Sequence, residues 1–329
     1  MEQGGKRGRH PTEISFANKW DWHDLVVEDG GTPSAEIDQL RLNIPGMEEW
    51  LDTVSKVKGS YISVRFPNGV DPVIFGTMMY SVNSTIGSDR SYQQYHYFVN
   101  QDTLITMNID DDTWAIMNQA NRMTMFQQCE DAKDGLFVLT RTILHYLHQG
   151  MDQFEINLRE LERLMEKSNR RNLMDQILTA RFELLYWNNL FISFQELGVA
   201  ANEAFHDKLE VNRFYQQLYY RLERIDRLFK HYSDEIDTLI SIDDAVSSYR
   251  GNEIMKTLTI ITAVFMPATV LGAIWGMNFD WIPFMKMSWG FIGMCLFISL
   301  STVGMYLWMI KKGWTGDLLH GKSNKDNHL

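Results

Sequence analysis

Cysteine is scarce in this chain of 329 residues. Its two cysteines, Cys129 and Cys295, are too few for a disulfide framework and fit a reducing compartment. Positive charge is also in deficit: the chain has 31 Lys and Arg but 42 Asp and Glu, which gives a net charge of −11. That balance argues against a nucleic-acid partner, whose phosphates would be repelled. The N-terminus lacks the apolar run of a secretory signal, so we expect the first part of the chain in the cytosol.

The common signatures of enzymes are missing as well. The sequence contains no phosphate-binding glycine loop, no H-E-x-x-H and no G-x-S-x-G. We therefore expect neither an enzyme nor an organic cofactor, and any transport should be passive.

Two long uncharged runs are present near the C-terminus, at 257–275 and 289–310. They cover 19 and 22 positions, and a helix needs about 20 apolar residues to cross a bilayer. Buried helices of a soluble protein are the alternative, but such helices nearly always carry a charged face. The sequence therefore predicts two transmembrane helices, with the bilayer as a partner.

Basic residues flank the two runs on their outer sides. Arg250 and Lys256 precede the first run, and Lys311 and Lys312 follow the second, with Trp314 as a further membrane anchor. The positive-inside rule then places both termini in the cytosol and the short connecting loop outside. We expect a multi-pass protein of the cell membrane.

The first two hundred residues indicate an α/β domain and then helices. Strand-like pairs at 61–66 with 72–80, and at 95–99 with 103–109, are separated by turn residues, and a helix is expected near 46–57. The predicted segments are a cytosolic α/β domain at 1–125, a helical hairpin at 126–205, a stalk helix at 206–256, transmembrane helix 1 at 257–275, an external loop at 276–288, transmembrane helix 2 at 289–310 and a basic cytosolic tail at 311–329.

An apolar seam with alternating steps of three and four residues runs along the stalk. A helix this long must pack against neighbours, and we expect these to be copies of itself around an axis. Asp243 falls where the repeat calls for an apolar residue, and Asp244 follows it. Two interpretations are open. A straight helix drifts against a 3.5-residue repeat, which would bring Asp243 to the surface. Alternatively, Asp243 lies at an interface between subunits, where its carboxylate would bind a regulatory cation. The seam comprises Val211, Tyr215, Leu218, Leu222, Ile225, Phe229, Tyr232, Ile236, Leu239 and Val246.

Two spans per chain cannot enclose an aqueous path, so a channel would need several chains. The first run is the better lining, because a mildly polar stripe follows one of its faces. Threonines in such a run can also bond to helix carbonyls and mark nothing. Pro267 lies in mid-span, where it removes a backbone hydrogen bond. The stripe comprises Asn252, Met255, Thr259, Thr262, Met266, Thr269 and Ala273.

The stretch W-G-M-N-F-D-W at 275–281 lies between the two runs. Gly276 can end the first helix with a positive φ. Asn278 offers a neutral amide, which a symmetric assembly would repeat as a ring. Such a ring accepts hydrogen bonds from the waters of a hydrated Mg²⁺ without removing them. The alternative is a polar loop with no role toward ions.

The G-M-N triplet at 276–278, placed between two spans, resembles the signature of the CorA-type magnesium transporter family. The likeness extends over 252–279 and to K-K-G-W at 311–314. It implies an α+β cytosolic domain, a long stalk helix and two C-terminal transmembrane helices, assembled as a funnel-shaped homopentamer.

The resemblance also implies roles for individual residues. Asn252, Met255, Leu258, Met266, Thr269 and Asn278 match the family's pore-facing positions. Met255 and Leu258 would form a hydrophobic constriction, and Gly276, Met277 and Asn278 the selectivity filter. Mg²⁺ would be both the transported ion and, bound between subunits, the regulatory ion.

This chain departs from the family pattern at two places. Ser241 stands where members often carry an interfacial aspartate, which leaves Asp243 or Asp244 as substitutes. The outer loop has Asp280 as its only acid and adds Lys286. Feedback by cytosolic Mg²⁺ and ion attraction at the mouth are therefore in question.

Three other interpretations stay open. The same scaffold serves zinc transporters, although Met277 favours magnesium, and cobalt or nickel could also permeate. His145 and His148 lie three residues apart on a predicted helix, but with no nearby Cys or acid in register they are better read as polar-face residues than as zinc ligands. A non-conducting membrane scaffold or sensor is the alternative from another class.

Overall fold

The computed structural model describes residues 12–26, 35–81, 92–167, 172–277 and 287–314. The chain divides into two compact units, residues 1–240 and 241–329. Helix α7 (Arg213–Trp275) contributes residues to both units.

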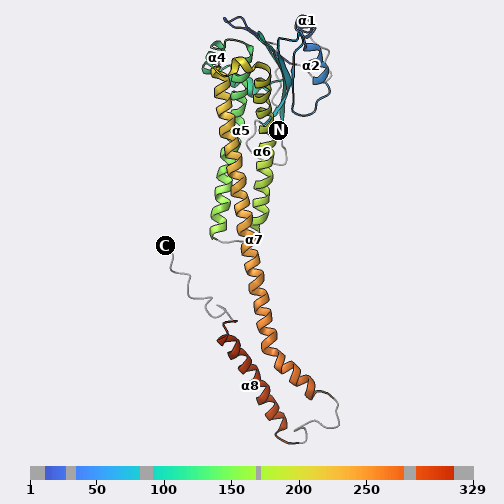
Figure 1. Cartoon of the computed structure of the whole chain (residues 1–329), viewed down its shortest axis with the longest axis vertical. Coiled ribbons are helices and arrows are strands. Elements are labelled where there is room, and N and C mark those ends of the chain that lie inside the picture. Colours follow the sequence, from blue (N-terminus) through green and yellow to red (C-terminus); the bar gives the residue numbers. More distant parts are fainter. Residues whose placement is uncertain (1–11, 27–34, 82–91, 168–171, 278–286, 315–329) are drawn as a thin grey trace, which may run out of the picture. The chain divides into compact units, whose positions relative to one another are not determined.

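A mixed sheet of six strands forms the first half of unit 1 (Figure 1). Its strand order is β1-β2-β6-β5-β4-β3; the β2–β6 pair is parallel and the other neighbours are antiparallel. The expected pairs at 61–66 with 72–80 and at 95–99 with 103–109 are confirmed as β3–β4 and β5–β6. The sequence interpretation did not identify β1 or β2. The strands are β1 (Thr12–Ser15), β2 (Asp21–Leu25), β3 (Tyr61–Arg65), β4 (Val73–Tyr80), β5 (Gln93–Val99) and β6 (Thr103–Met107).

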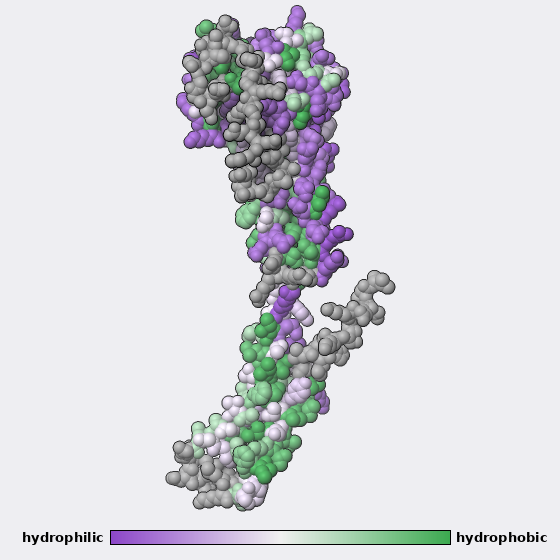
Figure 2. Space-filling view, turned by 180° about the vertical axis from the view of Figure 1, so that it is seen from behind, coloured by the Kyte–Doolittle hydropathy of each residue, from purple (hydrophilic) through white to green (hydrophobic). Residues whose placement is uncertain are grey.

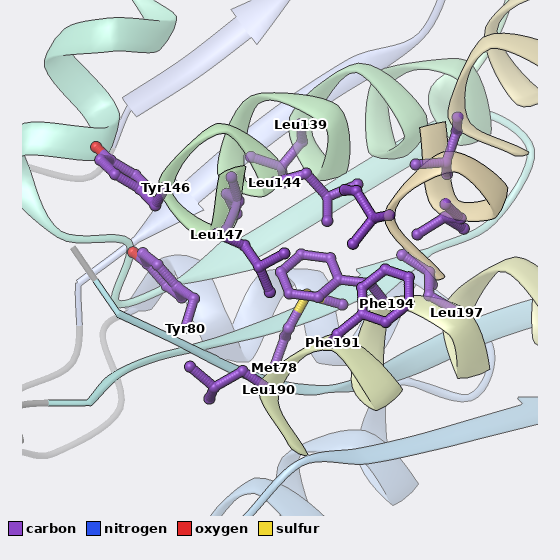
Figure 3. Close-up of a cluster of buried hydrophobic side chains, with 14 of the residues drawn as sticks. Met78, Tyr80, Leu139, Leu144, Tyr146, Leu147, Leu190, Phe191, Phe194 and Leu197 are labelled. Carbon is purple, nitrogen blue, oxygen red and sulfur yellow. The ribbon is translucent and has the colours of Figure 1, made fainter. Parts of the chain in front are cut away.

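Helices cover both faces of this sheet. The alternation along β4 shows why: Val73 and Phe75 pack with α1 (Ala35–Asn43) and α2 (Met47–Val54), whereas Ile74 and Met78 pack into the larger core on the other face. That core also takes residues from α3 (Asp111–Met117), α4 (Ala120–Gln127), α5 (Ala132–Lys167) and α6 (Asn172–Leu209). Figure 3 shows side chains of β4, α5 and α6 meeting there, among them Met78, Leu147 and Phe191.

The N-terminal part of α7 completes a bundle with α5 and α6. Three aromatic pairs join the helices, with ring centroids 5.5 Å apart for Phe137–Tyr215, 5.5 Å for Phe154–Tyr232 and 5.2 Å for Phe191–Phe229. The apolar seam from Tyr215 to Leu239 is therefore buried within one chain.

Burial of the seam corrects one expectation. The seam does not need copies of the chain to cover it, because α5 and α6 already do so over this length. The prediction for Val211 is wrong, since this residue precedes α7 and is 90% exposed. Residues 206–209, expected in the stalk, belong to α6.

Unit 2 contains the C-terminal part of α7 and helix α8 (Gly290–Lys311). Both helices are long and apolar enough to cross a membrane, and only 6% of the most apolar window of each is buried in the chain. Figure 2 shows apolar residues gathered over this part of the molecule. Helix α7 contains Pro267 and bends in its last third (Figure 1), as expected where a ring replaces a backbone N–H.

Gly150 on α5 leaves room for the side chain of Trp187 on α6. A Cβ atom built on Gly150 would lie 2.4 Å from the indole ring of Trp187, which is buried. Gly150→Ala should therefore lower stability by about 1–3 kcal/mol, because overpacking outweighs the roughly 1 kcal/mol that alanine gains in a helix. The thermal midpoint of the detergent-solubilised protein measures this.

Gly251→Ala is the matched control. Gly251 is also helical, but a Cβ there meets no atom within 4 Å. This variant should melt at or above the wild-type temperature. Equal melting of Gly150→Ala and wild type would show that the Trp187 contact does not constrain the bundle.

Candidate ion pathway and its surroundings

The C-terminal part of α7, in unit 2, has one face that the rest of the chain shields from solvent and one face that it leaves free. Residues that the chain covers or partly covers recur every three or four positions, and Ile260, the most shielded, is 8% exposed. The shielded face consists of Ile260, Ala263, Val264, Pro267, Ala268, Leu271 and Trp275. Helix α8 has a matching stripe that ends at the buried Met309. The spacing indicates that these two stripes face each other.

The predicted lining stripe lies on the free face. At about 100° per residue, its centre is on the side of α7 opposite to the shielded face. Every member is exposed in the single chain: Asn252, Met255, Leu258, Thr259, Thr262, Met266, Thr269 and Ala273. The single chain thus leaves uncovered the residues that the sequence singled out, and it covers the face between the two helices.

The threonines of α7 bond to their own helix. The Oγ1 of Thr259 donates to the carbonyl of Met255 (2.9 Å), that of Thr262 to Leu258 (2.8 Å) and that of Thr269 to Phe265 (3.1 Å). Such back-bonding is the alternative that the sequence left open, and it occurs. It does not remove the polarity of the stripe, because a hydroxyl that donates its hydrogen keeps two acceptor lone pairs. Each threonine therefore presents an acceptor outward.

The end of α7 differs from the expectation for Gly276. The Gly276 N–H bonds to the carbonyls of Gly272 (2.9 Å) and Ala273 (3.2 Å), and Met277 N–H bonds to Ile274 (3.3 Å). Gly276 does not have a positive φ, so the predicted left-handed cap is wrong. The helix ends in a tightened turn, as helix termini often do. Asn278, Asp280 and Lys286 lie outside the described residues.

The K-K-G-W stretch closes α8 with a Schellman motif. Gly313 has φ 72°, its N–H bonds to Ile310 (2.9 Å), and the Trp314 N–H bonds to Met309 (3.1 Å). The Trp314 ring packs against Trp308, with centroids 5.5 Å apart. The sequence interpretation identified Lys311, Lys312 and Trp314 as membrane anchors but did not predict this cap, although Gly313 is a signal for it.

Gly313→Ala should weaken this cap. A Cβ in the left-handed region costs about 1 kcal/mol, so the variant should melt a few degrees below wild type in detergent. Gly304→Ala, inside α8 and with no atom within 4 Å of its Cβ, is the control and should leave the midpoint unchanged or raised. Equal effects of the two substitutions would contradict the role of the cap.

The proposed regulatory acids lie at the N-terminal end of unit 2, which begins at Ser241. Asp243 is half-exposed and Asp244 exposed in the single chain, and Ser241, two residues before Asp243, is exposed as well. Among the described residues, no group of three or more His, Cys, Asp and Glu side chains is placed to hold a metal ion within one chain. The expectation that no acid lies in register with the two histidines is wrong, because Asp152 is one turn after His148 and its Oδ1 lies 4.0 Å from His148 Nε2.

A pair of glutamates in unit 1 was not identified from the sequence. Glu235 on α7 shares a hydrogen bond with Glu162 on α5. Burial, this bond and the Glu162 charge raise the pKa of Glu235 from 4.5 to about 7, against the opposing effects of His231 and Arg159. The imidazole of His231 lies 3.7 Å from the Glu235 carboxylate.

This pair predicts a pH-dependent stability. Unfolded Glu235 loses its proton near its ordinary pKa, whereas the folded protein keeps it until about pH 7. Stability should therefore fall as the pH rises through that window. Glu235→Gln should remove this loss and raise stability at pH 8 by about 1 kcal/mol, allowing for partial solvent exposure. The thermal midpoint between pH 5 and 8 tests this.

Glu223→Gln is the control for the pH series. Glu223 lies on the same helix and pairs with Arg227 at 2.6 Å on the surface, so its loss should matter little at any pH. A constant difference between Glu235→Gln and wild type across the pH range would contradict the prediction.

Comparisons with solved structures support the architecture. The structure of the CorA magnesium transporter from Methanocaldococcus jannaschii matches with a TM-score of 0.63 at 18% identity, covering 92% of this chain and 94% of that one. The full-length CmaX protein matches with a TM-score of 0.60 at 16% identity, covering 89% and 88%. With these two structures the chain shares an α/β domain, a long helix and two C-terminal apolar helices, the fold of a protein with two candidate membrane spans.

Sequence comparison gives the family. The model of the CorA-like Mg²⁺ transporter proteins matches residues 72–312, and this chain belongs to that family. It is a transport protein and not an enzyme. The magnesium transport protein CorA of Bacillus subtilis is 28% identical over 281 residues, 85% of this chain and 87% of the relative. The cobalt/magnesium transport protein CorA of Thermotoga maritima is 30% identical over 101 residues, 31% of this chain and 29% of the relative.

Proposed function

We propose that several copies of this chain form a passive channel that admits hydrated Mg²⁺ across the inner or plasma membrane into the cytosol. The observation that carries the proposal is the uncharged stripe of acceptors and apolar residues on the free face of α7. It agrees with the names of the relatives, which are magnesium or cobalt/magnesium transport proteins.

The chemistry of the stripe suits a hydrated cation. Water molecules bound to Mg²⁺ point their hydrogens outward, and Mg²⁺ gives them up reluctantly. Back-bonded threonines can accept from these hydrogens but cannot compete as donors. Without fixed negative charge along the path, the ion is stabilised enough to enter and weakly enough to leave.

Three parts of the path have separate tasks in this proposal. Asn278, the residue after the described end of this segment, supplies the outer ring of amides. Gly276 and Met277 complete the selectivity filter. Met255 and Leu258, both more than half exposed in one chain, form the constriction that closes by excluding water. Asn252 lies one turn before this constriction. We infer a homopentamer, as the family likeness implies, with both termini in the cytosol.

Energy for uptake comes from the membrane potential. It supplies about 2.3 kcal/mol per charge per 100 mV, or about 4.6 kcal/mol for a divalent ion moving inward. Feedback in this proposal comes from cytosolic Mg²⁺ held between copies near Asp243 or Asp244, which restrains opening when the ion is plentiful.

Ion uptake into liposomes that hold the purified protein tests the proposal. Mg²⁺ flux should be present in wild type at low internal Mg²⁺ and should fall at least tenfold in Asn278→Ala, because the amide acceptors are lost. Asn278→Asp should also reduce flux, since a carboxylate ring holds a divalent ion too tightly to release it. Asn189→Ala, on the exposed surface of α6, is the control and should conduct normally.

Parallel runs with other ions separate the alternatives. Zn²⁺ flux without Mg²⁺ flux would assign the chain to transition-metal transport, and Co²⁺ or Ni²⁺ flux beside Mg²⁺ would widen its substrate range. Correctly assembled oligomers that pass none of these ions would overturn the channel in favour of a non-conducting scaffold or sensor.

A further inference from the structure

Five arginines gather in unit 1, far along the sequence from the ion pathway. This arginine cluster consists of Arg122 on α4, Arg141 on α5, and Arg213, Arg221 and Arg224 on α7. Arg122, Arg141 and Arg221 are half-buried, and the other two are exposed. The pKa of Arg221 is lowered to about 10, first by burial and then by the charges of Arg141, Arg224 and Arg122. The pKa of Arg141 is also lowered, by burial and then by the charges of Arg122 and Arg213. The guanidinium groups are thus close enough to repel one another.

No carboxylate of the described residues forms an ion pair with the cluster. Elsewhere in unit 1 basic side chains do pair with acids: Arg181 with Asp237 at 2.6 Å and Lys230 with Asp226 at 2.7 Å. Acids are not in short supply, because Asp and Glu outnumber Lys and Arg by 42 to 31. The arginine cluster is therefore a local reversal of the chain's overall charge.

The hydrogen bonds of the cluster are also incomplete. The Arg141 guanidinium donates to the side-chain oxygen of Gln217, and Arg221 Nη1 donates to the backbone carbonyl of Arg141 at 3.3 Å. The Nε atoms of Arg141 and Arg221 are buried and have no partner among the described residues. Because a guanidinium keeps its charge, this repulsion is not relieved by loss of a proton.

We propose that the arginine cluster binds a multiply charged oxyanion of the phosphate class. A phosphoryl group offers several oxygens, and each guanidinium can hold two of them in its planar fork. Inorganic phosphate and the phosphates of a nucleotide share this chemistry. His145 lies near two of these arginines, since burial followed by the charges of Arg221 and Arg122 lowers its pKa.

Acidic side chains of a second copy are the other candidate. The arrangement disfavours them, because α4, α5 and α7 of one chain supply all five arginines. Arg122, Arg141 and Arg221 are only half-buried, so a small diffusible anion reaches their outer edges more readily than the side chain of another copy does.

Calorimetry and thermal melting of the full-length protein in detergent test the proposal. Sodium phosphate and ATP are titrated separately in buffer free of divalent ions, each against NaCl of equal ionic strength. Phosphate, ATP or both should bind and raise the midpoint of wild type; the stronger of the two identifies the source. Arg221→Gln should weaken this binding at least tenfold, as expected for the loss of a charge-assisted bond.

Arg227→Gln is the matched control. Arg227 is an exposed arginine on α7 that already pairs with Glu223, so its loss should leave anion binding unchanged. A second readout separates a ligand site from a structural role. Without anion, Arg221→Gln should melt at or above the wild-type temperature, because removing one guanidinium relieves repulsion.

Two results would overturn the proposal. The first is a midpoint that responds to phosphate and ATP no more than to chloride, or that responds equally in wild type and Arg221→Gln. The second is an Arg221→Gln protein that melts lower without anion and loses its oligomeric mass. That outcome would show that the arginines hold carboxylates of another copy.

Discussion

The apolar surface of the two C-terminal helices is the constraint on which the rest depends. Helices α7 and α8 shield one face of each other, yet only a small share of either span is buried in one chain. Lipid can cover apolar side chains, but it cannot solvate the outward acceptors of Thr259, Thr262 and Thr269 as water does. The free face of α7 therefore has a better environment against a wet axis than against lipid, and a wet axis requires several chains. In the proposed channel, association depends on this surface and not on the seam in the N-terminal part of α7, which α5 and α6 already bury.

How far the sequence predicts this molecule depends on whether a pattern is local. The two spans and the β3–β4 and β5–β6 pairs follow from runs and turns of neighbouring residues, and they are present. The lining stripe stays a prediction: the structure shows that its residues share the free face of α7, as their helical spacing requires, and does not show what they line. The seam was found for the same reason, but its partner was misjudged. Periodicity shows that a face is buried without showing whether the same chain or another copy buries it.

Other features needed contacts that no local pattern carries. The parallel pairing of β2 with β6 joins segments about 80 residues apart, and β1 and β2 are too short to signal themselves. Glu162 and Glu235 meet only because α5 and α7 are aligned, which their spacing in the sequence does not reveal. Gly276 shows the opposite failure. A glycine after a helix predicts a left-handed cap. Here the carbonyls of Gly272 and Ala273 accept hydrogen bonds from the Gly276 N–H and so continue the helical turn. Among the described residues of unit 2, the left-handed glycine is Gly313. Asn278 stays a prediction, since it lies outside the described residues.

Charge is placed differently where an ion must pass and where one must stay. In the proposed pore, the neutral acceptors on the free face of α7 would offer a hydrated cation many weak bonds and no fixed counter-charge, so that entry and exit would remain comparable in free energy. The arginine cluster, as proposed, has the reverse design: fixed like charges lie near one another, and the Nε atoms of Arg141 and Arg221 have no partner among the described residues. Without its ligand such a cluster opposes folding, because repulsion and burial both act on the guanidinium groups. A chain with an excess of acids could pair these arginines with a few substitutions. That they stand unpaired is the physical reason to regard the cluster as a binding site and not as packing.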